Sequence, residues 1–151
     1  MHDSYLSDAC LSGMGFWSPR TCEGFQCAVP ANSQNGIFFF EALAVLSALH
    51  HVCEHVMPKP HHLTILTDSS NTFDMFNSLH ALLAYNSILI TAIDLLLKSG
   101  VQLHFFNVPQ SKNKVADALS WLDGSTAHQL QSNLVISNFT PPQLALGEAS
   151  L

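Results

Sequence analysis

The sequence has few charged residues. Lys, Arg, Asp and Glu make up 11% of its 151 residues, well below the roughly 25% that is typical of soluble domains. A disordered chain combines high charge with low hydrophobicity, so the hydrophobic content of 48% excludes that class. Five basic residues stand against eleven acidic ones, for a net charge of −6. This balance argues against a scaffold that binds nucleic acid by charge alone, but not against an enzyme that acts on nucleic acid through bound metal.

Long hydrophobic runs and targeting signals are also missing. The most apolar stretch that we single out, residues 87–97, is interrupted by Thr91 and Asp94. It is shorter than the roughly 18–20 residues of a membrane span. The first residues, Met-His-Asp-Ser, contain no basic region of the kind that begins a signal peptide. We therefore expect an intracellular protein, cytoplasmic or nuclear, that is not secreted and has no membrane partner.

No CxxC pair occurs among the four cysteines, which are Cys10, Cys22, Cys27 and Cys53. A zinc ribbon is therefore not supported, and free thiols in a reducing compartment are expected.

Histidine, in contrast, is abundant. Five of the nine histidines lie within thirteen positions, at 50, 51, 55, 61 and 62. His51 and His55 are one helical turn apart and could bind zinc. Val52 follows His51, however, so the HExxH signature of zinc proteases is absent. We interpret the cluster as solvated histidines at a helix end and in a loop, with zinc binding as the alternative.

The pattern of apolar residues predicts an α/β domain. Three short strands separated by turn residues are expected at 5–10, 14–17 and 25–29. The following segments are expected as a helix at about 40–56, a strand at 62–68, helices at 71–83 and 88–98, a strand at 101–108 and a helix at 114–122. This order predicts a mixed sheet with helices packed on its faces. We expect residues 1–124 to form the domain and residues 125–151 a tail or linker that is loosely held.

Four carboxylates lie in or beside these apolar segments. Asp8 and Asp68 end two predicted strands, Glu41 lies in the first turns of a helix, and Asp117 lies in the last helix. A carboxylate is costly to bury unless something pairs with it, and Lys and Arg are scarce. Divalent cations are the expected partners. Two such ions about 3.5–4 Å apart can hold both reacting oxygens of a phosphodiester.

The same residues lie in motifs with a family resemblance. Residues 8–15, DACLSGMG, resemble the first motif of retroelement ribonuclease H domains, an Asp followed by small residues and a Gly-x-Gly turn. Residues 40–49 resemble the helical Glu motif of that family, and residues 66–71 its Thr-Asp-Ser motif. Residues 108–120 are similar to the VPG…N..ADALS ending of long-terminal-repeat and DIRS-like retrotransposon polyproteins. These motifs occur in the order of the family and cover about residues 4–122.

The resemblance implies a ribonuclease H-like fold, with a five-stranded mixed sheet flanked by helices. It also implies metal-dependent endonucleolytic cleavage of the RNA strand of RNA–DNA hybrids. By position, the four metal-binding carboxylates are Asp8, Glu41, Asp68 and Asp117. They would hold two Mg²⁺ ions, for which Mn²⁺ can substitute. Asp8 and Asp68 would contact both ions, while Glu41 would hold the ion nearer the leaving 3′ oxygen and Asp117 the ion that activates water.

Substrate contacts and partners are implied as well. The expected substrate-binding residues are Ser69, Asn71, Asn107, Lys112 and Asn113. For Ser69 and Asn71, capping of the following helix is the alternative. The implied partners are an RNA–DNA hybrid and a polymerase domain of the same polyprotein, and a retroelement particle is a further implied location.

Departures from the family pattern keep an alternative open. Asn107 stands where many relatives carry a histidine, Gln110 stands where a glycine is usual, and no basic protrusion for gripping the hybrid is present. These features favour a noncatalytic remnant of the fold that serves as an interaction or structural domain. Two other classes with this fold fit worse. Cys10 stands where a proofreading exonuclease needs Glu, and transposase and integrase cores lack a helical acid like Glu41.

Overall fold

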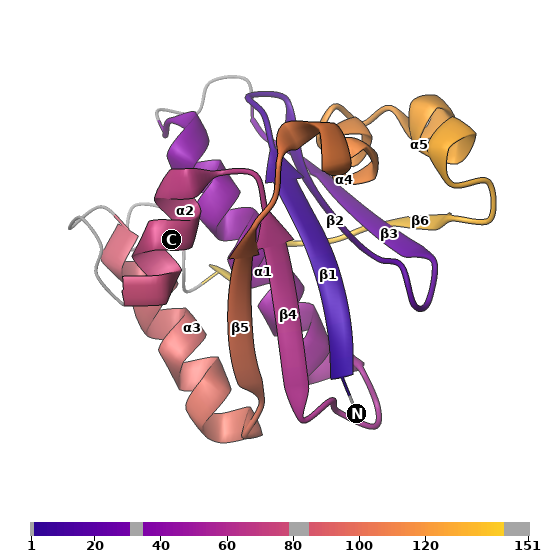
Figure 1. Cartoon of the computed structure of the whole chain (residues 1–151). Helices are drawn as coiled ribbons and strands as arrows, with labels where there is room; N and C mark the ends of the chain where they lie inside the picture. The colour runs from indigo at the N-terminus through magenta and orange to yellow at the C-terminus, as the bar shows by residue number, and fades with distance from the viewer. Residues whose placement is uncertain (1, 31–34, 79–84, 144–151) are drawn as a thin grey trace.

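The computed structural model describes residues 2–30, 35–78 and 85–143 (Figure 1). In chain order its elements are β1 (His2–Ala9), β2 (Gly13–Ser18), β3 (Glu23–Ala28), α1 (Ile37–His55), β4 (His62–Thr67), α2 (Ser70–Ser78), α3 (Asn86–Ser99), β5 (Gln102–Asn107), the 3₁₀ helix η2 (Gln110–Lys112), α4 (Lys114–Ser120), α5 (Gly124–Leu130) and β6 (Val135–Asn138). The end of the helix expected at 71–83 lies outside the described residues.

The strands form one mixed sheet with the order β5-β4-β1-β2-β3-β6. The first three strands form the expected antiparallel meander. β4 pairs parallel to β1, and β5 pairs parallel to β4. The predicted α/β fold with a mixed sheet is confirmed, but the expected number of five strands is wrong, because β6 adds a sixth beside β3.

The extra strand comes from the segment that was expected to be a loosely held tail. For residues 125–138 that expectation is wrong. The carboxylate of Asp123 caps α5 by accepting a hydrogen bond from the backbone N of Thr126 at 3.1 Å. β6 then pairs in parallel with β3, Gly24 opposite Ile136. A small second core joins α4 to this segment and consists of Val115, Ala118, Leu119, Ala127 and Leu134.

The helix α1 forms the centre of the main core. It packs on β1 and β2, and α3 packs against it in turn. By length and composition α1 is the one helix of the described residues that could cross a membrane, but 67% of its apolar window is buried inside the protein. Residues 87–97, which were expected to be the most apolar stretch, lie in α3, whereas the helix that is long and apolar enough to cross a membrane is α1. The apolar character of α1 is explained by its position between the sheet and α3.

A candidate metal centre of carboxylates

Two aspartates meet because β1 and β4 run in parallel. Ser7 of β1 lies opposite Thr67 of β4. Asp8 follows Ser7 and Asp68 follows Thr67, so both aspartates lie at the same carboxyl edge of the sheet. Both strands are central in the sheet. Asp8 is therefore buried, with 5% of its surface exposed.

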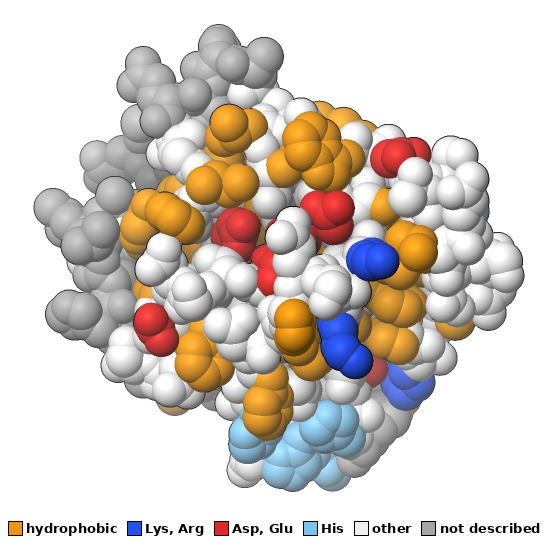
Figure 2. Space-filling view, turned by 45° about the horizontal axis from the view of Figure 1, so that its top comes forward, with side chains coloured by type: hydrophobic (Ala, Val, Ile, Leu, Met, Phe, Trp, Pro, Cys, Tyr) orange, Lys and Arg blue, Asp and Glu red, His pale blue; other side chains and the backbone are white. Residues whose placement is uncertain are grey.

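Glu41 reaches the same place from the first turns of α1. One side-chain oxygen from each of Asp8, Glu41 and Asp68 lies within 4.8 Å of the other two. Within the described ranges, this is the group of three or more acidic, His or Cys side chains that could hold a metal ion. The Oε2 atom of Glu41 is buried and has no hydrogen-bond partner. Figure 2 shows acidic side chains gathered near the middle of the face that carries this edge.

Asp117, the fourth predicted carboxylate, lies in the first turn of α4 and is half-buried. It is not a member of the three-carboxylate group, but its charge contributes to raising the pKa values of Asp8 and Asp68. The structure therefore brings three of the four predicted acids into one group and places the fourth near it.

Two glycines allow α4 to lie close to the sheet. A Cβ atom at Gly15 would stand 2.5 Å from the Cβ of Leu119, and one at Gly13 would stand 2.6 Å from the carbonyl O of Ser120. The turn expected for this Gly-x-Gly pattern is wrong, because both residues lie in β2, and Gly15 lies within the strand expected at 14–17. The glycines are needed here for the close approach of a helix, and that approach positions Asp117.

Asn113 links the beginning of α4 to the carboxylates. Its side-chain Nδ2 donates a hydrogen bond to the backbone O of Ser7 at 2.8 Å, and its proximity to Asp68 opposes the rise in the pKa of that carboxyl group. Only 1% of Asn113 is exposed. It was predicted to contact substrate, but such contact would need an exposed side chain, so in this structure Asn113 is a positioning residue.

Burial raises the pKa values of all three carboxyl groups. Burial, followed by the charge of Asp68, raises the pKa of Asp8 to about 8. Burial also raises the pKa of Glu41 to about 7, against a hydrogen bond from Ser69 that lowers it. The pKa of Asp68 is raised as well, again mainly by burial. A divalent ion would favour the charged forms of all three side chains, and their oxygen donors suit Mg²⁺ or Mn²⁺.

Ser69 has a structural role in this edge of the sheet. It is buried, and its Oγ accepts a hydrogen bond from the backbone N of Thr72 at 3.2 Å. This contact caps α2, which was one of the two roles expected of Ser69 from the sequence. Ser69 also lowers the pKa of Glu41, so the cap of α2 lies beside the carboxylate group.

The other predicted substrate residues are exposed near the same edge. Asn71 lies in the first turn of α2, and Asn107 ends β5 opposite Thr67. Lys112 lies in η2, directly before Asn113. These three side chains are accessible to a ligand that approaches the carboxylates.

A contact between Cys10, which directly follows β1, and α4 was not expected from the sequence. The thiol of Cys10 is buried and donates a hydrogen bond to the backbone O of Ser120 at 3.2 Å. From the sequence, Cys10 was only a small residue of the first motif and a mismatch to an exonuclease motif. No pattern in the sequence could have found this contact, because its acceptor is a backbone atom 110 residues away.

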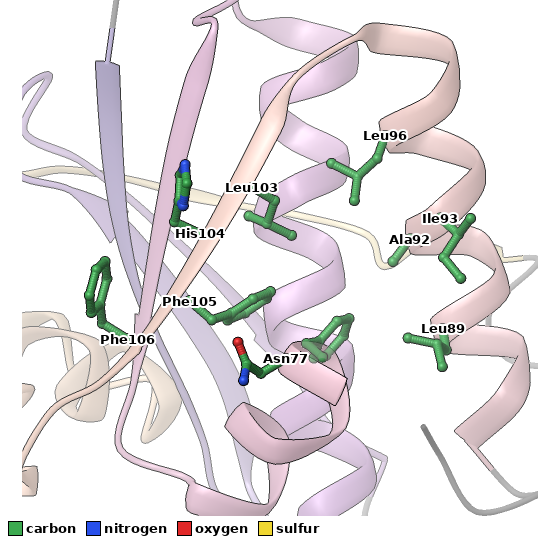
Figure 3. Close-up of a pocket in the computed structure, with 10 residues that line it drawn as sticks. Asn77, Leu89, Ala92, Ile93, Leu96, Leu103, His104, Phe105 and Phe106 are labelled. Carbon is green, nitrogen blue, oxygen red and sulfur yellow. The ribbon is translucent and has the colours of Figure 1, made fainter. Parts of the chain in front are cut away.

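Two hollows lie away from the carboxylates. One, of about 390 Å³, lies between α3 and the edge strand β5. Figure 3 shows Leu103 and Phe105 pointing from β5 toward α3, with His104 and Phe106 on the other side of the strand. Its lining contains no carboxylate, so it offers no site for a hard cation. The other hollow lies at the carboxyl-terminal end of α1 and contains histidines.

The histidines at the end of α1 correct one prediction. His55, His61 and His62 are exposed, as expected. His51 is half-buried, and its ring centroid lies 4.4 Å from that of Phe25. The interpretation of the whole cluster as solvated is therefore wrong for His51, because the last turns of α1 still face the aromatic core.

Comparison with known proteins agrees with this architecture. The family described as reverse transcriptase-like matches residues 11–121, which is more than two thirds of the chain. None of the curated proteins matches the sequence.

Solved structures of ribonuclease H proteins share the fold at low sequence identity. Ribonuclease H1 of Halobacterium salinarum matches with a TM-score of 0.60 and 15% identity, over 82% of this chain and 99% of that chain. LC11-RNase H1, solved in complex with an RNA/DNA hybrid, matches with a TM-score of 0.66 and 13% identity, over 78% and 92%. The N-terminal ribonuclease H domain of a Mycobacterium tuberculosis protein, solved as a fusion with maltose-binding protein, matches with a TM-score of 0.62 and 14% identity, over 85% and 97%.

Proposed function

Because the chain belongs to the reverse transcriptase-like family and has a ribonuclease H-like fold of retroelement type, we propose that it is a metal-dependent endonuclease that hydrolyses the RNA strand of RNA–DNA hybrids. The observation that supports this proposal best is the group formed by Asp8, Glu41 and Asp68, whose oxygens lie within 4.8 Å of one another. Asp117 completes the set of four acids on the neighbouring helix.

The residues present fit a pair of hard cations. All the donors are carboxylate oxygens, and the Oε2 atom of Glu41 is buried without a partner. Asp8 and Asp68 would be shared between two Mg²⁺ or Mn²⁺ ions, and Glu41 and Asp117 would each hold one of them. When bound, such ions stabilise the charge that develops at a phosphodiester during its displacement. Asn113 would keep the first turn of α4 in place beside Asp8 through its hydrogen bond to the backbone O of Ser7.

The exposed side chains around the carboxylates would contact the substrate. Asn71, Asn107 and Lys112 can reach phosphate or sugar groups, which position a nucleic acid without reading its sequence. Trp121, which follows α4, is 57% exposed and can stack on a base. The 2′-hydroxyl group of the cleaved strand would distinguish RNA from DNA. We expect products with 5′-phosphate and 3′-hydroxyl ends.

The low basic content indicates a partner. Five Lys and Arg residues in the chain cannot supply the many phosphate contacts of a tight nuclease. A polymerase domain of the same polyprotein would hold the hybrid and deliver it to the carboxylates. The protein would then act inside the cell, in the cytoplasm, the nucleus or a retroelement particle.

Incubation with a labelled RNA–DNA hybrid tests the proposal. We expect cleavage of the RNA strand with Mg²⁺ or Mn²⁺, and none of double-stranded DNA of the same sequence. The second candidate, a noncatalytic remnant of the fold, is favoured by Asn107 and by the scarcity of basic residues. Binding of the hybrid without cleavage, in either metal, would favour that candidate.

A further inference from the structure

The pocket at the carboxyl-terminal end of α1 combines imidazole and phenyl rings. It has a volume of about 390 Å³, and three histidines of α1 line it together with three phenylalanines of β2, β3 and the segment after β6: His50, His51 and His55 with Phe16, Phe25 and Phe139. The proposed nuclease activity uses none of these residues.

The spacing of the histidine rings suits a common metal ion. The ring centroids of His51 and His55 lie 5.8 Å apart, and those of His50 and His55 lie 5.9 Å apart. With metal–nitrogen bonds of about 2.0–2.1 Å, two imidazoles on one ion have ring centres roughly 5–6 Å apart. His55 is exposed and is the neighbour of both other rings. In the described part of the chain the group of three ligand atoms within 4.8 Å of one another is the carboxylate group. Among the histidines, His51 and His55 are four residues apart in α1, and side chains at that spacing lie on one face of a helix.

Two carboxylates lie near these histidines. Glu54 acts by its charge on His50, and Glu23 acts on His51. They give the pocket a negative field that attracts a cation.

We propose that His51 and His55 form a second metal site, for a d-block divalent cation such as Zn²⁺, separate from the carboxylate centre. Imidazole nitrogens favour zinc, copper and nickel over Mg²⁺. At a rise of 1.5 Å per residue, His51 lies roughly 15 Å along α1 from Glu41. An ion at this site would connect two consecutive turns near the end of α1, beside the wall formed by Phe25 and Phe139.

Zinc titration of the full chain in excess Mg²⁺ tests the proposal, because Mg²⁺ competes for the carboxylates. The informative variants are His55→Ala, which removes an exposed ring, and His51→Phe, which keeps a ring packed against Phe25. The matched control is the double variant His62→Ala/His104→Ala. That pair has ring centroids 5.9 Å apart and lies on the exposed face of β4 and β5.

We expect the unmodified protein to bind one Zn²⁺ by calorimetry and to gain melting temperature. Both single variants should lose at least about tenfold in affinity, while the control retains it. With Cu²⁺, the electron paramagnetic resonance spectrum should show nitrogen ligands that His55→Ala reduces in number. Far-UV circular dichroism confirms that each variant is folded. No zinc binding by the unmodified protein, full affinity in both single variants, or loss of binding in the control would each overturn the proposal.

Discussion

The side-chain Nδ2 of Asn113 donates a hydrogen bond to the backbone O of Ser7 at 2.8 Å. Ser7 precedes Asp8, and Asn113 precedes α4, which carries Asp117. One buried amide thus fixes the relative positions of two acids that are 109 residues apart in the sequence. Loss of this contact should disturb the site as well as the fold.

Asn113→Ala should therefore lower both stability and activity. The backbone O of Ser7 would remain buried without its donor, at a cost of about 1–3 kcal/mol in the free energy of unfolding. A misplaced Asp117 should reduce kcat by about tenfold to a hundredfold. Denaturant unfolding and hybrid cleavage measure the two effects. The control Asn133→Ala removes an exposed amide far from the carboxylates and should change neither. Unchanged kcat in Asn113→Ala would contradict the positioning role.

Gly15→Ala should force α4 away from β2. The new Cβ would lie 2.5 Å from that of Leu119, which neither helix nor strand can accommodate without a shift. We expect a loss of about 1–3 kcal/mol in the free energy of unfolding, together with loss of hybrid cleavage. Gly36→Ala is the matched control, since a Cβ there meets nothing within 4 Å. Equal melting temperatures for the two variants would show that the close approach of α4 is not required.

Without metal, the carboxylates should make the protein less stable as the pH rises. The pKa of Asp8 is raised to about 8 in the folded state, against an ordinary value of about 3.9. The folded state therefore binds the proton more tightly, and between pH 4 and pH 8 the free energy of unfolding falls with increasing pH. Glu41, with a pKa of about 7, acts in the same direction.

Denaturant unfolding in EDTA at several pH values measures this effect. The variant Asp68→Asn removes a repelling charge and should show a smaller decline toward pH 8. Histidines with lowered pKa values contribute the opposite slope, but they contribute equally to both proteins and cancel in the comparison. Mg²⁺ at pH 8 should restore stability to the unmodified protein more than to the variant. Identical pH slopes for the two proteins would show that the acids do not interact as the structure indicates.

The isolated chain should bind a hybrid weakly, with a shallow dependence on salt. Each phosphate contact contributes about −0.9 to the slope of log affinity against log salt for duplex DNA. Lys112 and Lys114 are exposed beside the carboxylate edge, and the other three basic residues are scattered through the chain. We expect a slope of roughly −2 to −3. A fluorescence anisotropy titration over a salt series measures it, and a slope typical of six or more contacts would mean that another surface binds the hybrid.

The order of strands and helices and the four acids could be predicted because each follows from a local pattern. Asp8 and Asp68 end apolar strands, and the sequence alone shows this. The role of Asn113 could not be predicted, since burial decides it: the same residue type would contact substrate if exposed. For Ser69 the sequence left capping and substrate contact open, and its burial and its bond to Thr72 favour capping. β6 was missed because its four residues are mostly exposed and show no alternation. The two glycines of β2 were assigned to a turn because glycine has the same local signature in turns and at helix contacts.

The measurement that tests the central claim most directly compares the unmodified protein with Asp68→Asn on an RNA–DNA hybrid in Mg²⁺ or Mn²⁺. The variant loses one negative ligand and keeps the shape of the side chain. Its activity should fall by orders of magnitude, while its melting temperature without metal stays equal or rises, because a repulsion is removed. Asp94→Asn, which changes an exposed acid paired with Lys98, should retain full activity. Equal cleavage by Asp68→Asn and the unmodified protein would contradict the assignment of the carboxylates as the metal centre.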